Sequence, residues 1–210
     1  MTKRDTINKI PIYKLQAPED ILKYYKDWTE NNKYNKDMID WNYTAPKETA
    51  SVLKKYAFDK KYKILDAGCG TGLVGIELKK LGYFNIDGVD FSQDMLDLVP
   101  QDVYKNLQKV DLNSNLKIKE DTYDVIVCVG TFTFGHVKAH ALDELIRITK
   151  SKGLICFTIN EGIYKEYNFD KKIKQLSDSQ IWKVKEFFKS NYITNKDVKA
   201  WLCLAEIEKK

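Results

Sequence analysis

Long apolar runs are missing from this sequence of 210 residues. No stretch approaches the roughly 18 to 20 consecutive apolar residues that a membrane-spanning helix requires, so the pattern argues against such a helix. Residues 1–7 also lack the apolar segment of a secretory signal peptide. We therefore expect a cytoplasmic protein that does not associate with a membrane, long enough to form one compact unit with a full core.

Cysteine is scarce, and no pair shows the Cys-x-x-Cys spacing of a metal or redox site. Cys128, Cys156 and Cys203 fall within apolar runs that are typical of buried strands, whereas Cys69 lies in a glycine-rich segment. Buried thiols of this kind usually act as small apolar side chains. We predict neither a disulfide framework nor a bound metal.

Arginine is almost absent, because only Arg4 and Arg147 occur among the 35 basic residues. Arginine is the side chain best suited to bidentate contacts with phosphate and guanine. The lysines are scattered among 30 acidic residues, so the net charge of +5 predicts a solvated surface and no nucleic-acid partner.

From residue 61 onward, short runs rich in β-forming residues alternate with helical stretches. This alternation is typical of a parallel sheet covered by helices. Residues 124–129 are apolar on both faces, as expected for a central strand. The predicted strands are residues 62–67, 86–90, 107–112, 123–129 and 153–159, and the helices between and after them are residues 73–81, 93–98, 140–149 and 164–176. We expect Ser92 to cap the second of these helices and Gly82 to end the first.

The last forty residues have a different pattern. Residues 181–188 and 198–207 resemble strands, and the linker of residues 189–197 is too short for a helical crossover, so they should form an antiparallel hairpin. The whole pattern predicts an α/β fold, namely a Rossmann-like, seven-stranded, mostly parallel sheet that ends in an antiparallel hairpin. We place this core at residues 59–210.

Residues 1–58 are predicted to form an N-terminal helical cap that contributes to substrate binding. Pro18 and Pro46 stand where helices can begin. The segment is also rich in aromatic residues, notably Trp28, Tyr34, Trp41 and Tyr43. These rings can form a wall beside a positively charged ligand, or they can pack together as the core of the cap.

The run Asp66-Ala67-Gly68-Cys69-Gly70-Thr71-Gly72 follows the first predicted strand. Ligands of open α/β sheets bind beyond the carboxyl ends of the strands, where glycines let the backbone approach closely. A Gly-x-Gly-x-x-Gly spacing at residues 70–75 would by itself indicate a dinucleotide. The carboxylate of Asp66 is unfavourable beside a pyrophosphate but favourable near an ammonium, and the helix start can receive a carboxylate. An amino acid moiety such as that of S-adenosylmethionine (SAM) meets both conditions.

Further acidic residues end the next two predicted strands. Asp90 can accept both hydroxyl hydrogens of a ribose, and Asp111 can accept a hydrogen bond from an adenine amino group or cap its own loop. Met95 and Leu112 can pack against the adenine ring. The full set of predicted SAM-binding residues is Trp28, Tyr34, Asp66, Gly68, Cys69, Gly70, Thr71, Gly72, Asp90, Phe91, Met95, Asp111, Leu112 and Val129.

The order of three motifs resembles that of class I SAM-dependent methyltransferases. These motifs are the run from Ile64 to Gly72, Gly88-Val89-Asp90-Phe91-Ser92 and Tyr123-Asp124-Val125-Ile126-Val127. Trp41-Asn42-Tyr43-Thr44-Ala45-Pro46 and Phe134-Gly135-His136-Val137 resemble the methyltransferase-like 27 group more closely. The resemblance implies SAM binding and methyl transfer, but it does not supply the methyl acceptor.

The loop after the fourth strand, residues 130–136, should face the transferred methyl group. It lacks the Asp/Asn-Pro-Pro-Tyr/Phe motif of amino-methyltransferases that act on nucleobases or glutamine. His136 is a candidate general base, and the alternative is a hydrogen-bonded histidine at a helix start. We expect methylation of a small molecule. A protein methyltransferase and a non-catalytic SAM-binding module stay open, whereas Asp66 and the hairpin disfavour an NAD-dependent oxidoreductase.

Overall fold

The computed structural model describes residues 8–209, so residues 1–7, on which the expectation of no signal peptide rests, lie outside it. Seven strands form one sheet in the order β3-β2-β1-β4-β5-β7-β6. The first five strands pair in parallel, and β7 pairs antiparallel with both β5 and β6, which confirms the predicted fold class. The strands are β1 (Ile64–Ala67), β2 (Ile86–Asp90), β3 (Asn106–Lys109), β4 (Tyr123–Phe132), β5 (Thr149–Asn160), β6 (Trp182–Ile193) and β7 (Val198–Ile207).

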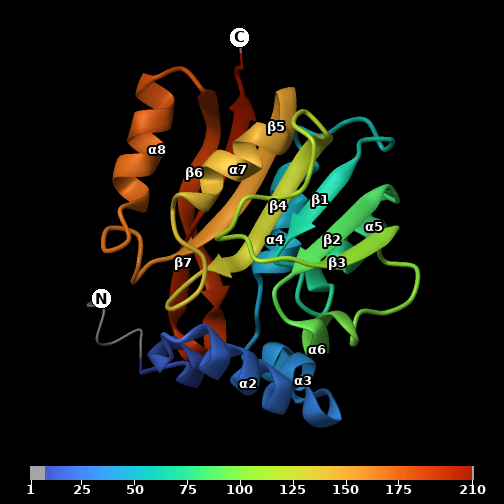
Figure 1. Cartoon of the computed structure of the whole chain (residues 1–210), viewed down its shortest axis with the longest axis vertical. Helices are drawn as coiled ribbons and strands as arrows, with labels where there is room; N and C mark the ends of the chain where they lie inside the picture. The colour runs from blue at the N-terminus through green and yellow to red at the C-terminus, as the bar shows by residue number, and fades with distance from the viewer. Residues whose placement is uncertain (1–7, 210) are drawn as a thin grey trace.

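Helices cover both faces of this sheet, and a separate group lies across one end of it. In Figure 1, α7 and α8 lie on one face and α4 lies on the other, where α5 packs beside it. α2 and α3 cross the edge toward which the arrow of β4 points. The helices are α2 (Pro18–Thr29), α3 (Lys33–Asp40), α4 (Ala45–Leu53), α5 (Leu73–Lys80), α6 (Gln93–Leu96), α7 (Ala141–Ile148) and α8 (Phe169–Asp178), with short 3-10 turns at Pro11–Lys14, Glu30–Asn32 and Thr194–Lys196.

The centre of the sheet is apolar on both sides, as its sequence predicted. All four residues of β1 are buried, and so are Val125 to Val129 in β4. Such continuous burial is possible because helices cover both faces of a parallel strand. The thiols of Cys128, Cys156 and Cys203 are buried and unpaired, which confirms their prediction as core side chains.

Several element boundaries differ from prediction, and three of these differences have a structural reason. β3 ends at Lys109 because it is an edge strand that pairs only with β2, so Asp111 lies in the following turn rather than at the strand end. β6 continues to Ile193, where it still pairs with Val198, so the hairpin connection is much shorter than residues 189–197. α8 begins at Phe169 instead of residue 164, because residues 161–168 form turns that end in the left-handed backbone of Asn168.

The predicted helix ends at the site are confirmed. Oγ of Ser92 accepts a hydrogen bond from the backbone N–H of Met95 at 3.3 Å, which caps α6. Gly82 adopts a left-handed backbone with φ of 87° just beyond α5, where a side chain would be strained. These ends matter because α5 and α6 follow the two strands that carry Asp66 and Asp90.

The N-terminal segment contains two kinds of helix. α2 and α3 lie beyond the end of the sheet, whereas α4 packs on a face of the sheet against α5 and β4. The division of the chain at residue 58 stays a prediction. Within residues 1–58, α2 and α3 cover the end of the sheet, whereas α4 belongs to the layered core.

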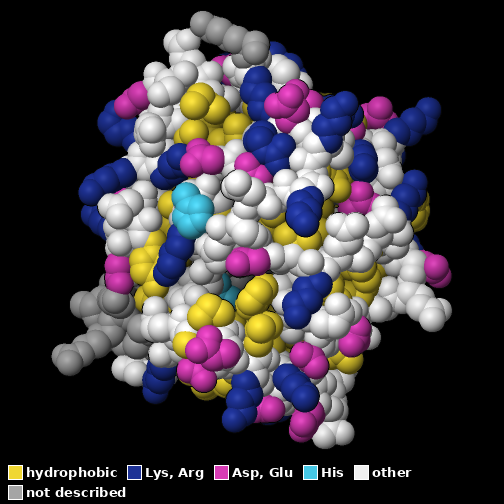
Figure 2. Space-filling view, in the orientation of Figure 1, with side chains coloured by type: hydrophobic (Ala, Val, Ile, Leu, Met, Phe, Trp, Pro, Cys, Tyr) yellow, Lys and Arg dark blue, Asp and Glu magenta, His cyan; other side chains and the backbone are white. Residues whose placement is uncertain are grey.

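The surface carries mixed charge. Figure 2 shows basic and acidic side chains interspersed over the visible face, with no large patch of one sign. Among residues 8–209, every helix is too short or too polar to cross a lipid bilayer.

Candidate functional site

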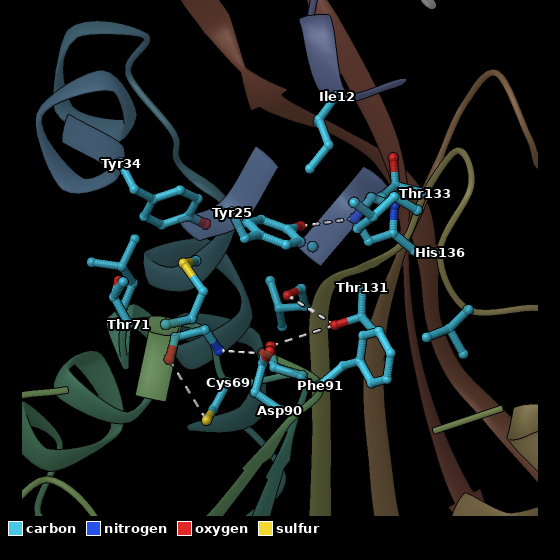
Figure 3. Close-up of a pocket in the computed structure, with 18 of the residues that line it drawn as sticks. Ile12, Tyr25, Tyr34, Cys69, Thr71, Asp90, Phe91, Thr131, Thr133 and His136 are labelled. Carbon is cyan, nitrogen blue, oxygen red and sulfur yellow. Dashed lines mark hydrogen bonds between the residues drawn. The ribbon is translucent and has the colours of Figure 1, made fainter. Parts of the chain in front are cut away.

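One cavity lies between the carboxyl ends of the central strands and the helices α2 and α3. Figure 3 shows Thr71 and Cys69 on one side of it, Thr133 and His136 on the other, and Tyr25 between Tyr34 and His136. The structure thus brings most of the predicted SAM-binding residues together. Those that line the cavity are Trp28, Tyr34, Gly68, Cys69, Gly70, Thr71, Asp90, Phe91, Met95, Asp111, Leu112 and Val129.

The glycine loop is held close to β4 and β2. The backbone N–H groups of Gly68 and Cys69 both donate to the carbonyl oxygen of Val89, at 2.8 and 2.9 Å. Gly68 has a φ of 80°, and a Cβ atom at this position would collide with the side chain of Thr131. Only glycine tolerates both the positive φ and the close contact with Thr131, so the path of the loop depends on Gly68.

Asp90 stands at the end of β2 and binds the glycine loop directly. Its carboxylate oxygens accept the backbone N–H groups of Gly70 at 2.8 Å and Ser92 at 2.9 Å. Burial raises the pKa of Asp90, and these backbone hydrogen bonds oppose the rise. A carboxylate has about four acceptor positions, so it can still accept hydrogen bonds from the hydroxyls of a ribose.

Asp66 and Gly72 do not line the cavity. Asp66 is fully buried beneath the glycine loop, where Oδ2 accepts a hydrogen bond from the hydroxyl of Tyr104 at 2.6 Å. Burial raises the pKa of Asp66 to about 7, because the hydrogen bond from Tyr104 offsets the desolvation only in part. Asp66 thus supports the loop from behind, and its role near the ammonium of a ligand, directly or through water, stays a prediction.

Asp111 lines the cavity from the turn after β3. Its side chain is exposed, and Oδ1 accepts the backbone N–H of Asn113 at 2.8 Å. This hydrogen bond is the loop-capping alternative, and it engages one of the two carboxylate oxygens. Its contact with an adenine ring stays a prediction.

The N-terminal aromatic residues form one continuous wall. The ring of Trp28 lies 4.9 Å from that of Tyr34 and 5.5 Å from that of Trp41, measured between centroids. Nε1 of Trp28 donates to Asp37 at 2.6 Å, which fixes the indole between α2 and α3. The rings pack on one another and also line the cavity, and their contact with a positively charged ligand stays a prediction.

This wall is tied to the core on two sides. The hydroxyl of Thr71 in the glycine loop donates to Oδ1 of Asn35 at 2.6 Å. On the far side, the backbone N–H of Thr44 donates to the carbonyl oxygen of Tyr192 at 2.9 Å. The segment that covers the cavity is therefore hydrogen-bonded directly to the glycine loop.

His136 lies beside Tyr25 in the cavity wall. Nδ1 is 2.5 Å from the carbonyl oxygen of Phe134, and Nε2 is 2.8 Å from the hydroxyl of Tyr25. A carbonyl oxygen can only accept, so Nδ1 carries the proton and Nε2 accepts from Tyr25. Burial lowers the pKa of His136, which favours the neutral ring that this arrangement requires.

Sequence reasoning missed several cavity residues. Tyr25 belongs to the helically spaced apolar residues of α2 and lies one turn before Trp28. This spacing was the sequence signal that could have identified it as a cavity residue. Tyr13 and Tyr192 gave no signal, because they are brought to the cavity only by the fold, whereas Thr133 belongs to the loop that was expected to face the methyl group. Tyr192 lies near the end of β6, and its ring packs 5.3 Å from that of Tyr43.

Comparison with known proteins identifies the domain. A family model described as a methyltransferase domain matches residues 64–153, which include the glycine loop, Asp90 and all of β4. The human methyltransferase-like protein 27 is 33% identical over 141 residues, which cover 65% of this chain and 56% of the human protein. This chain contains a class I SAM-dependent methyltransferase domain.

Other relatives of this methyltransferase domain share its central region. Ribosomal protein L11 methyltransferase of Thermosipho melanesiensis is 30% identical over 115 residues, which cover 54% of this chain and 43% of that protein. The chain thus spans about half the length of these curated relatives. Among solved structures, magnesium protoporphyrin IX methyltransferase from Synechocystis, with bound SAM, aligns with a TM-score of 0.66 at 14% identity, covering 89% of this chain and 97% of that one. At that identity, the likeness concerns the fold alone.

The methyltransferase domain's cavity fits the methyl donor of its family. At Gly70 the loop backbone is open to the cavity, because a Cβ atom there would meet only the end of the Met95 side chain. Asp90 offers acceptors for a ribose, and Phe91, Met95 and Leu112 offer apolar contact for a purine ring. An adenosine with an amino acid tail requires acceptors for its ribose, apolar contact for its purine and an accessible loop backbone, and the cavity offers all three.

Proposed function

We propose that this protein transfers a methyl group from SAM to a small-molecule acceptor. The observation that carries the proposal is the joint position of the glycine loop, Asp90 and the Tyr25–His136 pair in one cavity. Asp90 and the turn after β3 would hold the adenosine, and the glycine loop would hold the amino acid end. When bound, SAM supplies an electrophilic methyl group on a positively charged sulfur.

The chain's own residues have three tasks in this proposal. The aromatic wall excludes water and presents ring faces that favour a positive charge. The enclosure positions the acceptor near the methyl group, and such alignment accounts for much of the catalysis in a displacement of this kind. The neutral His136 accepts a proton at Nε2 while Phe134 keeps the ring oriented through Nδ1.

A small acceptor is favoured because the cavity's far wall is buried. Ile12, Tyr13 and Ile21 line the cavity and are 3 to 4% exposed, so they close it off from the surface. A protein acceptor would have to insert a side chain beneath these residues. The alternative of a protein substrate, which the name of the ribosomal protein L11 methyltransferase keeps in view, therefore requires a much more open cap.

Incubation with methyl-labelled SAM tests this proposal. The protein is supplied with a metabolite extract and, separately, with a protein extract, and the label in each fraction is followed over time. We expect label in the metabolite fraction and none above background in the protein fraction. Label in proteins alone would support the second reading, and saturable SAM binding without label in either fraction would support a non-catalytic module.

A further inference from the structure

The half of the cavity around His136 has a distinctive chemistry. We call it the acceptor half and define it by Ile12, Tyr13, Tyr25, Thr133, His136 and Tyr192. Asp90 and Asp111 lie in the other half, next to the glycine loop and the turn after β3. In Figure 3, Ile12, Thr133 and His136 lie on the side of Tyr25 that faces away from Thr71.

The acceptor half carries no formal charge. Among residues 8–209, no lysine or arginine side chain lines any part of this cavity. Burial lowers the pKa of His136 and favours its neutral form, in which Nδ1 donates to the carbonyl oxygen of Phe134 and Nε2 accepts from the phenol of Tyr25. A ligand in this half therefore meets only aromatic, aliphatic and hydroxyl groups.

This neutrality discriminates between acceptor classes. A carboxylate or phosphate would lose its hydration without gaining a cationic partner, which is strongly unfavourable. An ammonium would lose its hydration without gaining a carboxylate in its own half, and in the SAM complex the positive sulfonium would repel it as well. A neutral acceptor avoids both penalties.

The polar groups of the acceptor half suit a hydroxyl. Oγ1 of Thr133 is buried beside the hydroxyl of Tyr13, and within residues 8–209 it has no other hydrogen-bond partner. The oxygen of Tyr13 accepts from Asn160 at 3.2 Å, so its own hydrogen is directed elsewhere. Tyr25 places a third hydroxyl in contact with His136. A ligand hydroxyl both donates and accepts, so it can satisfy such groups together.

We propose that the acceptor is a neutral small molecule with an apolar, ring-like body, and that the protein methylates it on a hydroxyl oxygen. This inference rests on the proposed function of methyl transfer from SAM. It adds the acceptor atom and the charge of the acceptor, neither of which follows from SAM binding.

The proton follows a defined path in this step. The acceptor's O–C bond forms as the bond between sulfur and methyl breaks, and S-adenosylhomocysteine is released. The hydroxyl proton passes to the oxygen of Tyr25, and the proton of Tyr25 passes to Nε2 of His136. The positive charge that leaves sulfur thus ends on the imidazolium, whose Nδ1–H stays bonded to Phe134.

The test measures binding of matched ligands to the protein saturated with S-adenosylhomocysteine, so no turnover is needed. The ligands are 4-propylphenol, 4-propylbenzoate, 4-propylbenzylamine and propylbenzene, which share one body and differ in their polar group. Tryptophan fluorescence and calorimetry provide two readouts. We expect 4-propylphenol to bind at least ten-fold more tightly than the benzoate and the amine, and several-fold more tightly than propylbenzene.

Two pairs of variants identify the cause of this preference. Thr133→Val should weaken 4-propylphenol about three- to ten-fold and leave propylbenzene unchanged, whereas Thr133→Ser should keep both. Val137→Lys places a cation in the cavity wall and should improve 4-propylbenzoate at least ten-fold, whereas Val137→Met should not. Val137 is 8% exposed, so the lysine can reach the cavity's edge.

The outcomes separate the two proposals. Failure of S-adenosylhomocysteine to bind would overturn the proposed function. Normal binding of S-adenosylhomocysteine with equal or tighter binding of the benzoate or the amine would overturn only the inference about the acceptor. An unchanged preference in Val137→Lys would likewise contradict selection by charge.

Discussion

His136 is held in one protonation state by two hydrogen bonds that run in opposite directions. The carbonyl oxygen of Phe134 takes the proton on Nδ1, and the phenol of Tyr25 donates to Nε2. Nε2 therefore stays basic, and the hydroxyl of Tyr25 connects it to the cavity. A histidine that only capped a helix would not need a donor on this nitrogen.

Replacing His136 with Asn removes the basic nitrogen but keeps a polar side chain. We expect turnover to fall by about 10² to 10⁴, the range typical of general base catalysis, with SAM affinity unchanged within two-fold. His140 supplies the control, because it is the other histidine of the chain and, unlike His136, it is not among the residues that line the cavity. Equal turnover in His136→Asn and His140→Asn would rule out the role of a base.

Asp66 should make stability depend on pH. Burial raises its pKa from 3.8 to about 7 in the folded protein, so the folded state holds a proton that the unfolded chain has released. Stability from this group therefore falls as pH rises from about 4 to 7, and the loss amounts to a few kcal/mol at most. Asn keeps the acceptor for Tyr104 and cannot ionise.

The prediction is that Asp66→Asn gains stability relative to the natural protein as pH increases from 5 to 8. Urea unfolding at several pH values, without SAM, measures the difference between the two proteins. Asp90 titrates in both proteins, so its contribution largely cancels. A difference that stays constant across this range would show that Asp66 is ionised throughout.

At the scale of elements, α2 and α3 are the parts that convert an open sheet edge into a cavity. They contribute Tyr25, Trp28 and Tyr34 to its wall, and Asn35 binds the hydroxyl of Thr71 in the glycine loop. A ligand that orders the glycine loop should therefore also hold this cap closed.

Thr71→Val breaks this connection while keeping the side chain's shape. SAM affinity should fall about three- to ten-fold, as for loss of one hydrogen bond, and limited proteolysis should cleave the cap faster. Thr71→Ser keeps the hydroxyl and should behave like the natural protein. Deletion of residues 1–40 is the more severe test, and unchanged SAM affinity together with unchanged activity would contradict a closing cap.

The elements also show what a sequence can and cannot predict. The alternation of apolar runs and helices from residue 61 predicted the sheet, because a strand buried on both faces has a recognisable composition. β3 was predicted too long, because an exposed edge strand lacks that composition. The glycine loop and Asp90 were predicted from local spacing, because both lie within one β-α-β unit.

The acceptor half was predicted only in part, through the loop of residues 130–136. Tyr13 and Tyr25 of the N-terminal segment meet that loop and Tyr192 only because β6 ends beside the cap. Asp66 shows a related difficulty, since its position in the motif indicated proximity to the ligand but not that Tyr104 would hold it beneath the loop.

At the scale of the whole molecule, the sheet brings two chemically different half-sites to one edge. In the proposed function, the glycine residues after β1 and Asp90 at the end of β2 would face the adenosine, and the neutral rings and hydroxyls around β4 and β6 would face the acceptor. The parallel order of β1, β2 and β4 is what places these ends at the same edge.

Calorimetric titration of SAM into the purified protein tests this account most directly. We predict saturable binding of one SAM per chain, a loss of about ten-fold or more in affinity for Asp90→Asn, and no binding of NADH. Saturating SAM at a hundred times its dissociation constant should also stabilise the fold by about 2.7 kcal/mol. Absence of SAM binding, or stoichiometric binding of NADH in its place, would contradict the account.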